Sequence, residues 1–222
     1  MLESTLGISQ QLADIERIRK LLGDDKLILM GHSYGALLAS LYAAEFPENV
    51  DKLILLNPAD LLVFPSGNKG LFENVRERLP ERDHKAYDKW QRRYLDLMQI
   101  FKEDEASLQQ LDADFLPFFI KATGDTIEGA PPVSPDLFGS WYTRAQFFGL
   151  GKRHDWSAHM GNITADTLII HGSKDFQPLA VSELYEQAIP NAQLVEIEEA
   201  AHFPHFNNAK ALEQQLRPFL NK

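Results

Sequence analysis

Four short apolar runs, each bordered by a turn signal, constrain the fold of this 222-residue chain more than any other feature. We expect them to be strands, at residues 26–30, 52–56, 167–170 and 193–197. The first three are continuously apolar rather than alternating, which is typical of parallel strands covered on both faces. Segments with helical periodicity lie before, between and after them, at residues 12–22, 37–46, 179–189 and 209–220. Strand alternating with helix predicts an α/β fold built on a mostly parallel sheet.

Composition excludes several classes of protein. The chain has no cysteine, which rules out a disulfide scaffold, a thiolate nucleophile and a Cys-ligated metal. Its 22 Lys and Arg against 32 Asp and Glu give a net charge of −10, which disfavours a nucleic-acid or anionic-membrane partner. No apolar run approaches the roughly 18 residues that span a membrane, and the first residues lack the basic and apolar regions of a signal peptide. We therefore predict a cytoplasmic protein.

The sequence Gly31-His32-Ser33-Tyr34-Gly35 lies where the first expected strand meets the following helix. That is the context of a nucleophile elbow, in which the glycines two residues before and after the serine let strand and helix approach. The serine hydroxyl would project at the carboxyl edge of the sheet, near a helix N-terminus that favours developing negative charge. Ser33 is therefore the predicted nucleophile.

A nucleophilic serine needs a base and an orienting acid, which follow it in the order Ser, Asp, His in this architecture. Asp175 follows the third expected strand, and His202 follows the fourth. Because the carboxyl ends of parallel strands meet at one edge, the three groups should converge on one site. His205 is the alternative base, and Asp60, after the second strand, is the alternative acid.

Residues 60–160 interrupt the alternation of strand and helix. We predict that they form a mostly helical cap inserted into a core made of residues 1–59 and 161–222. Aromatic residues gather in the later part of the cap: Phe115, Phe118, Phe119, Phe138, Trp141, Tyr142, Phe147 and Phe148. Most should pack the cap onto the sheet, and some should line an apolar pocket for the acyl or alcohol group of a substrate.

These motifs resemble the α/β-hydrolase superfamily, and in particular its proline-iminopeptidase-like branch. Its members show a similar Gly-His-Ser-Tyr-Gly elbow, a helix ending in Phe-Pro-Glu-Asn-Val and a strand Leu-Ile-Ile-His-Gly-Ser-Lys-Asp. The resemblance covers residues 8–58 and about 154–220, and it implies that Ser33, Asp175 and His202 are nucleophile, acid and base. The implied chemistry is acyl transfer through a covalent acyl-enzyme, which needs no metal or organic cofactor.

The chain departs from the family pattern at its start. The family has further strands before the helix that leads to the elbow, with a His-Gly-rich loop that donates one of two oxyanion-hole N–H groups. The resemblance assigns the other donor to Tyr34, and losing one donor typically costs about 100- to 1,000-fold in rate. The fold is therefore expected to be an N-terminally truncated α/β-hydrolase in which strand 26–30 is a bare apolar edge. Such an edge favours either a homo-oligomer or a chain clipped from a longer parent.

The sequence favours a serine hydrolase that cleaves small carboxylic esters and has a small-molecule ester or amide as its partner. A proline-iminopeptidase-like aminopeptidase is one alternative, and it would need cap carboxylates to hold a substrate ammonium. The available carboxylates are Glu103, Asp104, Glu105, Asp112, Asp114 and Asp125. A carbon–carbon bond hydrolase uses the same residues and stays open. The remaining alternative is a non-catalytic remnant that keeps the elbow but lacks half of the oxyanion hole.

Overall fold

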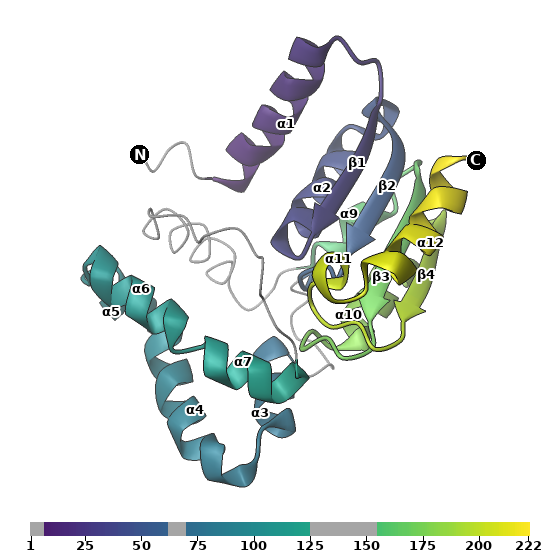
Figure 1. Ribbon diagram of the computed structural model, residues 1–222. Coiled ribbons are helices and arrows are strands. Elements are labelled where there is room, and N and C mark those ends of the chain that lie inside the picture. Colours follow the sequence, from purple (N-terminus) through teal and green to yellow (C-terminus); the bar gives the residue numbers. More distant parts are fainter. Residues whose placement is uncertain (1–6, 62–69, 125–154) are drawn as a thin grey trace.

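A parallel sheet with helices on both faces forms the body of the molecule in the computed structural model (Figure 1). The structure describes residues 7–61, 70–124 and 155–222. The strands are β1 (Leu27–His32), β2 (Val50–Leu56), β3 (Asp166–Gly172) and β4 (Ala192–Ile197). They lie in the order β1-β2-β3-β4, and every neighbouring pair is parallel. The predicted α/β fold is confirmed, and each strand lies within a few residues of its expected position.

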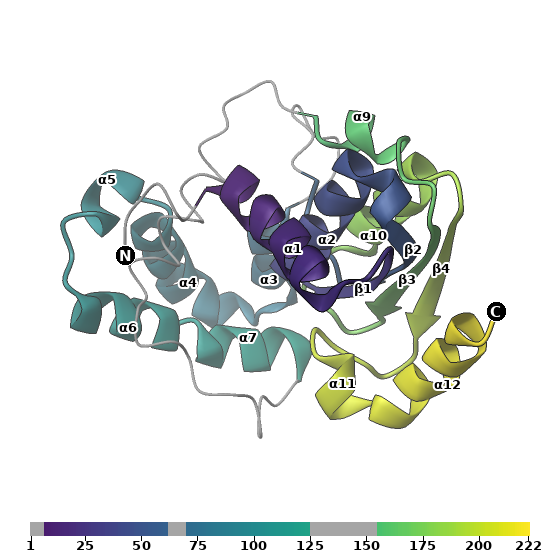
Figure 2. The same cartoon turned by 90° about the horizontal axis from the view of Figure 1, so that it is seen from above.

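One layer of helices covers the face of the sheet that carries the larger core. It contains α1 (Ile8–Leu22), α2 (Tyr34–Glu45), α9 (Ser157–Met160) and α10 (Leu179–Ala188), and a short 3₁₀ helix, η2 (Pro47–Asn49), joins α2 to β2. From above, these α-helices lie on one side of the strands (Figure 2). Leu53, Leu55 and Ile169 point into this layer and are completely buried against α2 and α10.

The opposite face of the sheet packs on α11 (Pro204–Asn207) and α12 (Ala209–Leu220). The intervening strand residues Ile54, Leu56, Leu168 and Ile170 form this second core with Leu212, Phe219 and neighbouring apolar residues. β2 and β3 are therefore buried on both faces, which explains why their sequences are continuously apolar.

Helices between β2 and β3 form a separate cluster beyond the carboxyl ends of the strands (Figure 1). They are α3 (Leu71–Arg78), α4 (Glu81–Tyr94), α5 (Leu97–Ile100), α6 (Glu105–Ala113) and α7 (Leu116–Thr123). Their core is aromatic, with the ring of Trp90 stacked on Phe115 at 4.8 Å between centroids. The division of the chain at residues 60 and 160 stays a prediction, and several residues singled out in the cap lie outside the described ranges: Asp125, Phe138, Trp141, Tyr142, Phe147 and Phe148.

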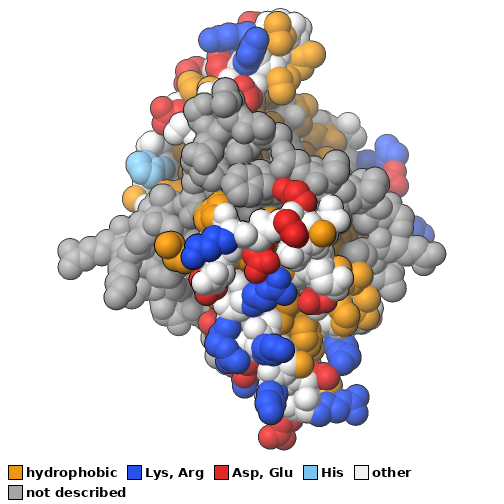
Figure 3. Space-filling view, turned by 90° about the vertical axis from the view of Figure 1, so that its left-hand side faces the viewer, with side chains coloured by type: hydrophobic (Ala, Val, Ile, Leu, Met, Phe, Trp, Pro, Cys, Tyr) orange, Lys and Arg blue, Asp and Glu red, His pale blue; other side chains and the backbone are white. Residues whose placement is uncertain are grey.

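β1 is one edge of the described sheet, as the sequence predicts, and β4 is the other. Ile28 and Met30 on this strand are 54% and 56% exposed. The nearby end of α1 adds Leu21 and Leu22, which are also exposed, and Figure 3 shows hydrophobic side chains beside basic ones at the top, over α1. No helix in the described ranges is long and apolar enough to cross a membrane.

Candidate active site

Ser33 occupies a strained turn between β1 and α2. Its backbone has φ 53° and ψ −120°, a conformation that costs a non-glycine residue of order 1–3 kcal/mol. Backbone hydrogen bonds maintain the turn: Ser33 N–H donates to the oxygen of Leu56 (2.9 Å), and its carbonyl accepts from Ala36 (3.0 Å) and Ala59 (3.1 Å). The strain therefore lies at the residue that the motif identifies as the nucleophile.

The close approach of β1 and α2 at this turn depends on Gly31. A Cβ atom on Gly31 would lie 2.2 Å from the carbonyl oxygen of Gly35 and 2.6 Å from the nitrogen of Ala36. A Cβ on Gly35 would meet nothing within 4 Å among the described residues. The expected close approach is confirmed at Gly31, whereas no described residue crowds Gly35.

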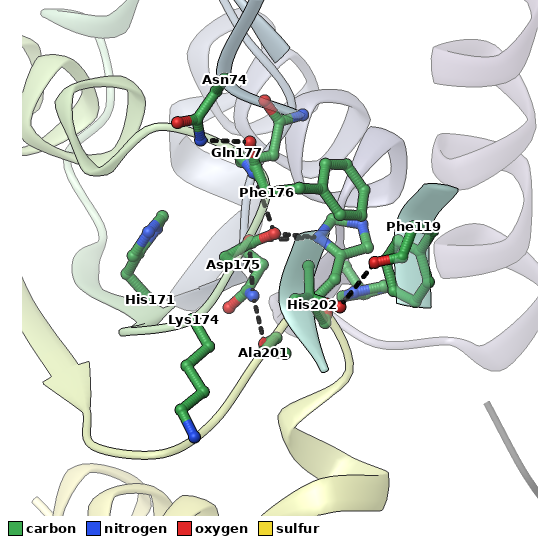
Figure 4. A network of polar contacts seen from close by, with 12 residues as sticks. Asn74, Phe119, His171, Lys174, Asp175, Phe176, Gln177, Ala201 and His202 are labelled. Carbon is green, nitrogen blue, oxygen red and sulfur yellow. Dashed lines mark hydrogen bonds and ion pairs between the residues drawn. The ribbon is translucent and has the colours of Figure 1, made fainter. Parts of the chain in front are cut away.

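Asp175 and His202 meet at the same edge of the sheet, although 26 residues separate them in the sequence. His202 Nδ1 lies 2.9 Å from Oδ1 and 3.1 Å from Oδ2 of Asp175, and Figure 4 shows this contact. The Asp175 side chain is 0% exposed, and His202 is 5% exposed. The backbone N–H of Gln177 also donates to Oδ1, at 3.0 Å.

The carboxylate of Asp175 stays ionised in spite of its burial. Burial is the largest influence and by itself raises the pKa of Asp175, but the charge and hydrogen bond of His202, with the Gln177 N–H, outweigh it and hold the pKa below its ordinary value. An ionised carboxylate accepts the proton on His202 Nδ1, which leaves Nε2 to act as a base.

Asn57 is a site residue that the sequence analysis missed. It directly follows β2, is completely buried and has a positive φ of 43°. Its Nδ2 donates to Asp175 Oδ2 at 2.6 Å and to the carbonyl oxygen of Ala201 at 2.8 Å. The sequence shows Asn57 only as a turn signal before a proline. Its place after a buried strand, at the edge that also carries Asp175 and His202, is the signal that could have identified it.

A second histidine supports the loop that carries His202. His32 Nε2 lies 2.6 Å from the backbone oxygen of His202, and the two ring centroids are 4.8 Å apart. Burial, followed by the charge of His202, lowers the pKa of His32 to about 4, so His32 is neutral at pH 7. The alternative base His205 is exposed, and its ring contacts are with His32, Phe203 and Phe206. The carboxylate bound to His202 is that of Asp175.

Aromatic rings surround His202 on the side of the cap. The centroids of Phe176 and Phe203 lie 4.3 and 5.1 Å from that of His202. Phe119 of α7 contacts both, at 5.1 and 6.1 Å. Phe119 therefore extends from the cap to the site, and Phe115, which is stacked on Trp90, also contacts Phe176 at 6.3 Å.

The cap also contacts the loop that carries Asp175 through polar groups. From α3, Asn74 Nδ2 donates to the carbonyl oxygen of Phe176 at 2.6 Å, and Arg78 Nη1 donates to that of Lys174 at 2.9 Å. Figure 4 shows Asn74 beside this loop. The backbone on both sides of Asp175 is therefore fixed by one cap helix.

Two parts of the predicted machinery lack a contact that would test them. Both Ser33 and His202 are described, and no hydrogen bond joins them in the structure. Tyr34 begins α2, so its N–H lies in the first turn of a helix, where an anion is stabilised. The roles of nucleophile, base and oxyanion donor stay predictions. Within the described ranges, no cluster of three or more His, Asp or Glu side chains could hold a metal ion.

Comparison with known proteins identifies the family. A family model described as alpha/beta hydrolase fold matches residues 4–209. The chain belongs to the α/β-hydrolase fold family. Over 229 residues it is 25% identical to a proline iminopeptidase of Saccharolobus solfataricus, covering 99% of this chain and 70% of the relative. It is 24% identical to the AB hydrolase superfamily protein YclE of Bacillus subtilis, covering 95% of this chain and 74% of that protein.

Solved structures agree with this assignment. The crystal structure of VinJ matches with a TM-score of 0.70 at 14% identity, covering 100% of this chain and 74% of that chain. The predicted resemblance to α/β-hydrolases of the proline-iminopeptidase-like kind is thereby confirmed. The cytoplasmic location inferred from composition stays a prediction.

Proposed function

We propose that this α/β-hydrolase is a serine hydrolase that cleaves small carboxylic esters through an acyl-enzyme. The observation that carries the proposal is the buried, hydrogen-bonded pair of Asp175 and His202 at the sheet edge where Ser33 forms a strained elbow. Ser33, Asp175 and His202 also follow one another along the chain in the order that α/β-hydrolases use. The similarity to a proline iminopeptidase, itself a hydrolase by name, supports the class of reaction.

The reaction would proceed in two halves. His202 Nε2 takes the proton of Ser33 Oγ as the oxygen attacks the ester carbonyl, and the Tyr34 N–H stabilises the resulting oxyanion. Protonated His202 then gives its proton to the leaving alcohol, and the acyl group stays on Ser33. Water, deprotonated by His202, then attacks the acyl carbonyl; the bond to Ser33 Oγ breaks, His202 returns the proton to Oγ, and the carboxylic acid leaves. Asp175 stays ionised throughout and orients the imidazole.

An ester is favoured over a peptide because several cap carboxylates already have partners. Glu103 pairs with Arg93 at 3.4 Å, and Asp104 caps α6 by accepting from the N–H of its third residue at 2.8 Å. Asp114 accepts from Gln110 at 2.7 Å. Paired assays on p-nitrophenyl esters and on prolyl amides separate the two activities. Faster turnover of the prolyl amide would replace the esterase proposal by the aminopeptidase.

Labelling with a fluorophosphonate probe tests the proposal before any substrate is known. Such probes react with a serine only when a base activates it. The wild-type protein and the control Ser9→Ala, an exposed serine of α1, should both be labelled, whereas Ser33→Ala should not. A folded wild-type protein that resists labelling would contradict the proposal and favour the non-catalytic remnant.

We also propose that the exposed edge of β1 pairs with a second copy of the chain. Unpaired N–H and C=O groups on an apolar edge are a template for another strand, and Ile28 and Met30 enlarge the apolar surface beside it. Size-exclusion chromatography with light scattering should find a dimer or higher assembly. Met30→Lys should dissociate it, and Met98→Lys, at a cap methionine that is 76% exposed, should not. A wild-type protein that is monomeric would refute the pairing.

A further inference from the structure

We infer that Asn57 is a positioning residue. It fixes the loop that carries Asp175 relative to the loop that carries His202, and it orients the carboxylate of Asp175 toward His202. This inference rests on the proposed hydrolase function. Asn57 does not touch the reacting atoms, so it acts through Asp175 and through the backbone next to His202.

The side-chain amide of Asn57 joins the ends of neighbouring strands. It extends from the end of β2 and places one N–H on Asp175, after β3, and the other on the carbonyl of Ala201, after β4. Since Ala201 immediately precedes His202, one amide group restrains both the acid and the segment that carries the base. The contact of His32 with the oxygen of His202 holds the next carbonyl of the same segment.

The orientation of this amide is fixed, and maintaining it is costly. Both hydrogens on Nδ2 face acceptors, whereas the reverse orientation would place the amide oxygen against the Asp175 carboxylate. As a result, Oδ1 of Asn57 is buried without a hydrogen-bond partner in the described part of the chain. A positive φ at a completely buried residue adds to the cost. Unfavourable features that coincide at one residue beside an active site are expected where function requires them.

Asn57 also influences the charge of Asp175. The titratable groups that act on this carboxylate are His202 after β4, His171 on β3, His32 on β1 and Arg78 on α3. Uncharged donors are the N–H of Gln177 and the amide of Asn57. If the amide donor is removed, more of the carboxylate charge acts on His202. The pair formed by Asp175 and His202 should then keep the imidazole proton to higher pH.

Asn57→Ala tests the inference because it removes the amide without adding a charge. An aspartate here would place a second carboxylate against that of Asp175, and its own charge would act on His202. We expect kcat for ester hydrolysis to fall about 10- to 100-fold, with KM nearly unchanged, since a hydrogen bond to a charged group is lost. The acid limb of the pH–rate profile should move up by about one pH unit. Asn191→Ala, at an exposed asparagine, should change neither quantity.

A second variant covers the case in which Asn57→Ala does not fold. Asn57→Ser removes both amide N–H donors and leaves only a shorter hydroxyl, and its acid limb should shift in the same direction by a smaller amount. A fall in kcat without movement of the acid limb, in whichever variant folds, would mean a purely structural role and would overturn the inference. Variants with the kcat and the acid limb of the wild type would also overturn the inference.

The failure of this inference is separable from the failure of the proposed function. The wild type and Ser33→Ala decide by probe labelling whether the site is a serine hydrolase at all. A readout that needs no turnover is the proton NMR titration of the His202 imidazole in a Ser33→Ala background. Adding Asn57→Ala should raise the apparent pKa of the pair formed by Asp175 and His202 there, and an unchanged titration would refute the role of Asn57.

Discussion

Replacing Gly31 by alanine gives the sharpest test of how the elbow is built. The new Cβ would lie 2.2 Å from the oxygen and 2.5 Å from the carbon of Gly35, and 2.6 Å from the nitrogen of Ala36. All three are backbone atoms, so no side-chain rotation relieves the overlap. Restoring even a 3.0 Å separation requires α2 to move by 3.0 − 2.2 = 0.8 Å relative to β1. That movement would disturb the hydrogen bonds that hold Ser33.

The expected loss of stability follows from these contacts. Overpacking a core costs about 1–3 kcal/mol when side chains can adjust, and here only backbone can move. Weakening the hydrogen bond from Ser33 to Leu56, at 2.9 Å, adds about 1 kcal/mol. We expect Gly31→Ala to lower the free energy of unfolding by about 3–4 kcal/mol.

Gly35→Ala is the matched control, because it adds the same methyl group to the same motif. Its Cβ meets no described residue within 4 Å, and alanine is favoured over glycine in a helix by up to about 1 kcal/mol. Urea unfolding followed by circular dichroism measures both variants, and with an m value of about 1–3 kcal/mol/M the midpoint of Gly31→Ala should fall by 1 M or more. If both variants unfold at the wild-type midpoint, the steric argument for the elbow is refuted.

Further predictions concern the pH dependence of stability and the cap. Because the pKa of His32 is lowered from 6.5 to about 4, the folded protein binds fewer protons than the unfolded chain between these values, so stability falls as the pH drops from 7 to 5. His32 should contribute about 2 kcal/mol to the loss seen in urea titrations, so the loss in His32→Gln should be smaller by that amount; equal losses in both would contradict it. Asp104 accepts from the N–H of Ser107 at the start of α6, so Asp104→Ala should cost about 1 kcal/mol, while Asp114→Ala at the other end costs less. Equal losses of stability in the two variants would show that the hydrogen bond of the N-cap adds nothing to the stability of α6.

The sequence predicted those features that depend on local patterns. The four strands were recognisable because their apolar runs are bounded by turn signals, and β2 and β3 are buried on both faces as such runs require. Asp175 and His202 were found because each follows a strand, in the order that α/β-hydrolases use. The structure brings them within 2.9 Å.

Other features depend on distances that a sequence does not contain. Nothing local distinguishes Asn57, whose side chain joins two loops more than 100 positions away, from an ordinary asparagine at a turn. Likewise, the sequence does not distinguish the two glycines of the elbow. Only the geometry shows that backbone atoms lie close to Gly31, while no described residue crowds Gly35. The same holds for the aromatic cap residues, since only the three-dimensional packing shows that Phe119 contacts both Phe176 and Phe203, the rings beside His202.

The contacts between α3 and the loop that carries Asp175 have a consequence for how such a protein can be engineered. Phe176 follows the acid directly, yet its ring belongs to the aromatic core of the cap, and Asn74 holds its carbonyl. A cap transplanted from another hydrolase would therefore remove packing from the loop that orients His202. In chimeras that exchange the cap together with residues 174–177, the carboxylate at position 175 should keep its orientation toward His202. Under the proposed function, substrate preference and catalytic competence would be transferred together, as one piece of the chain.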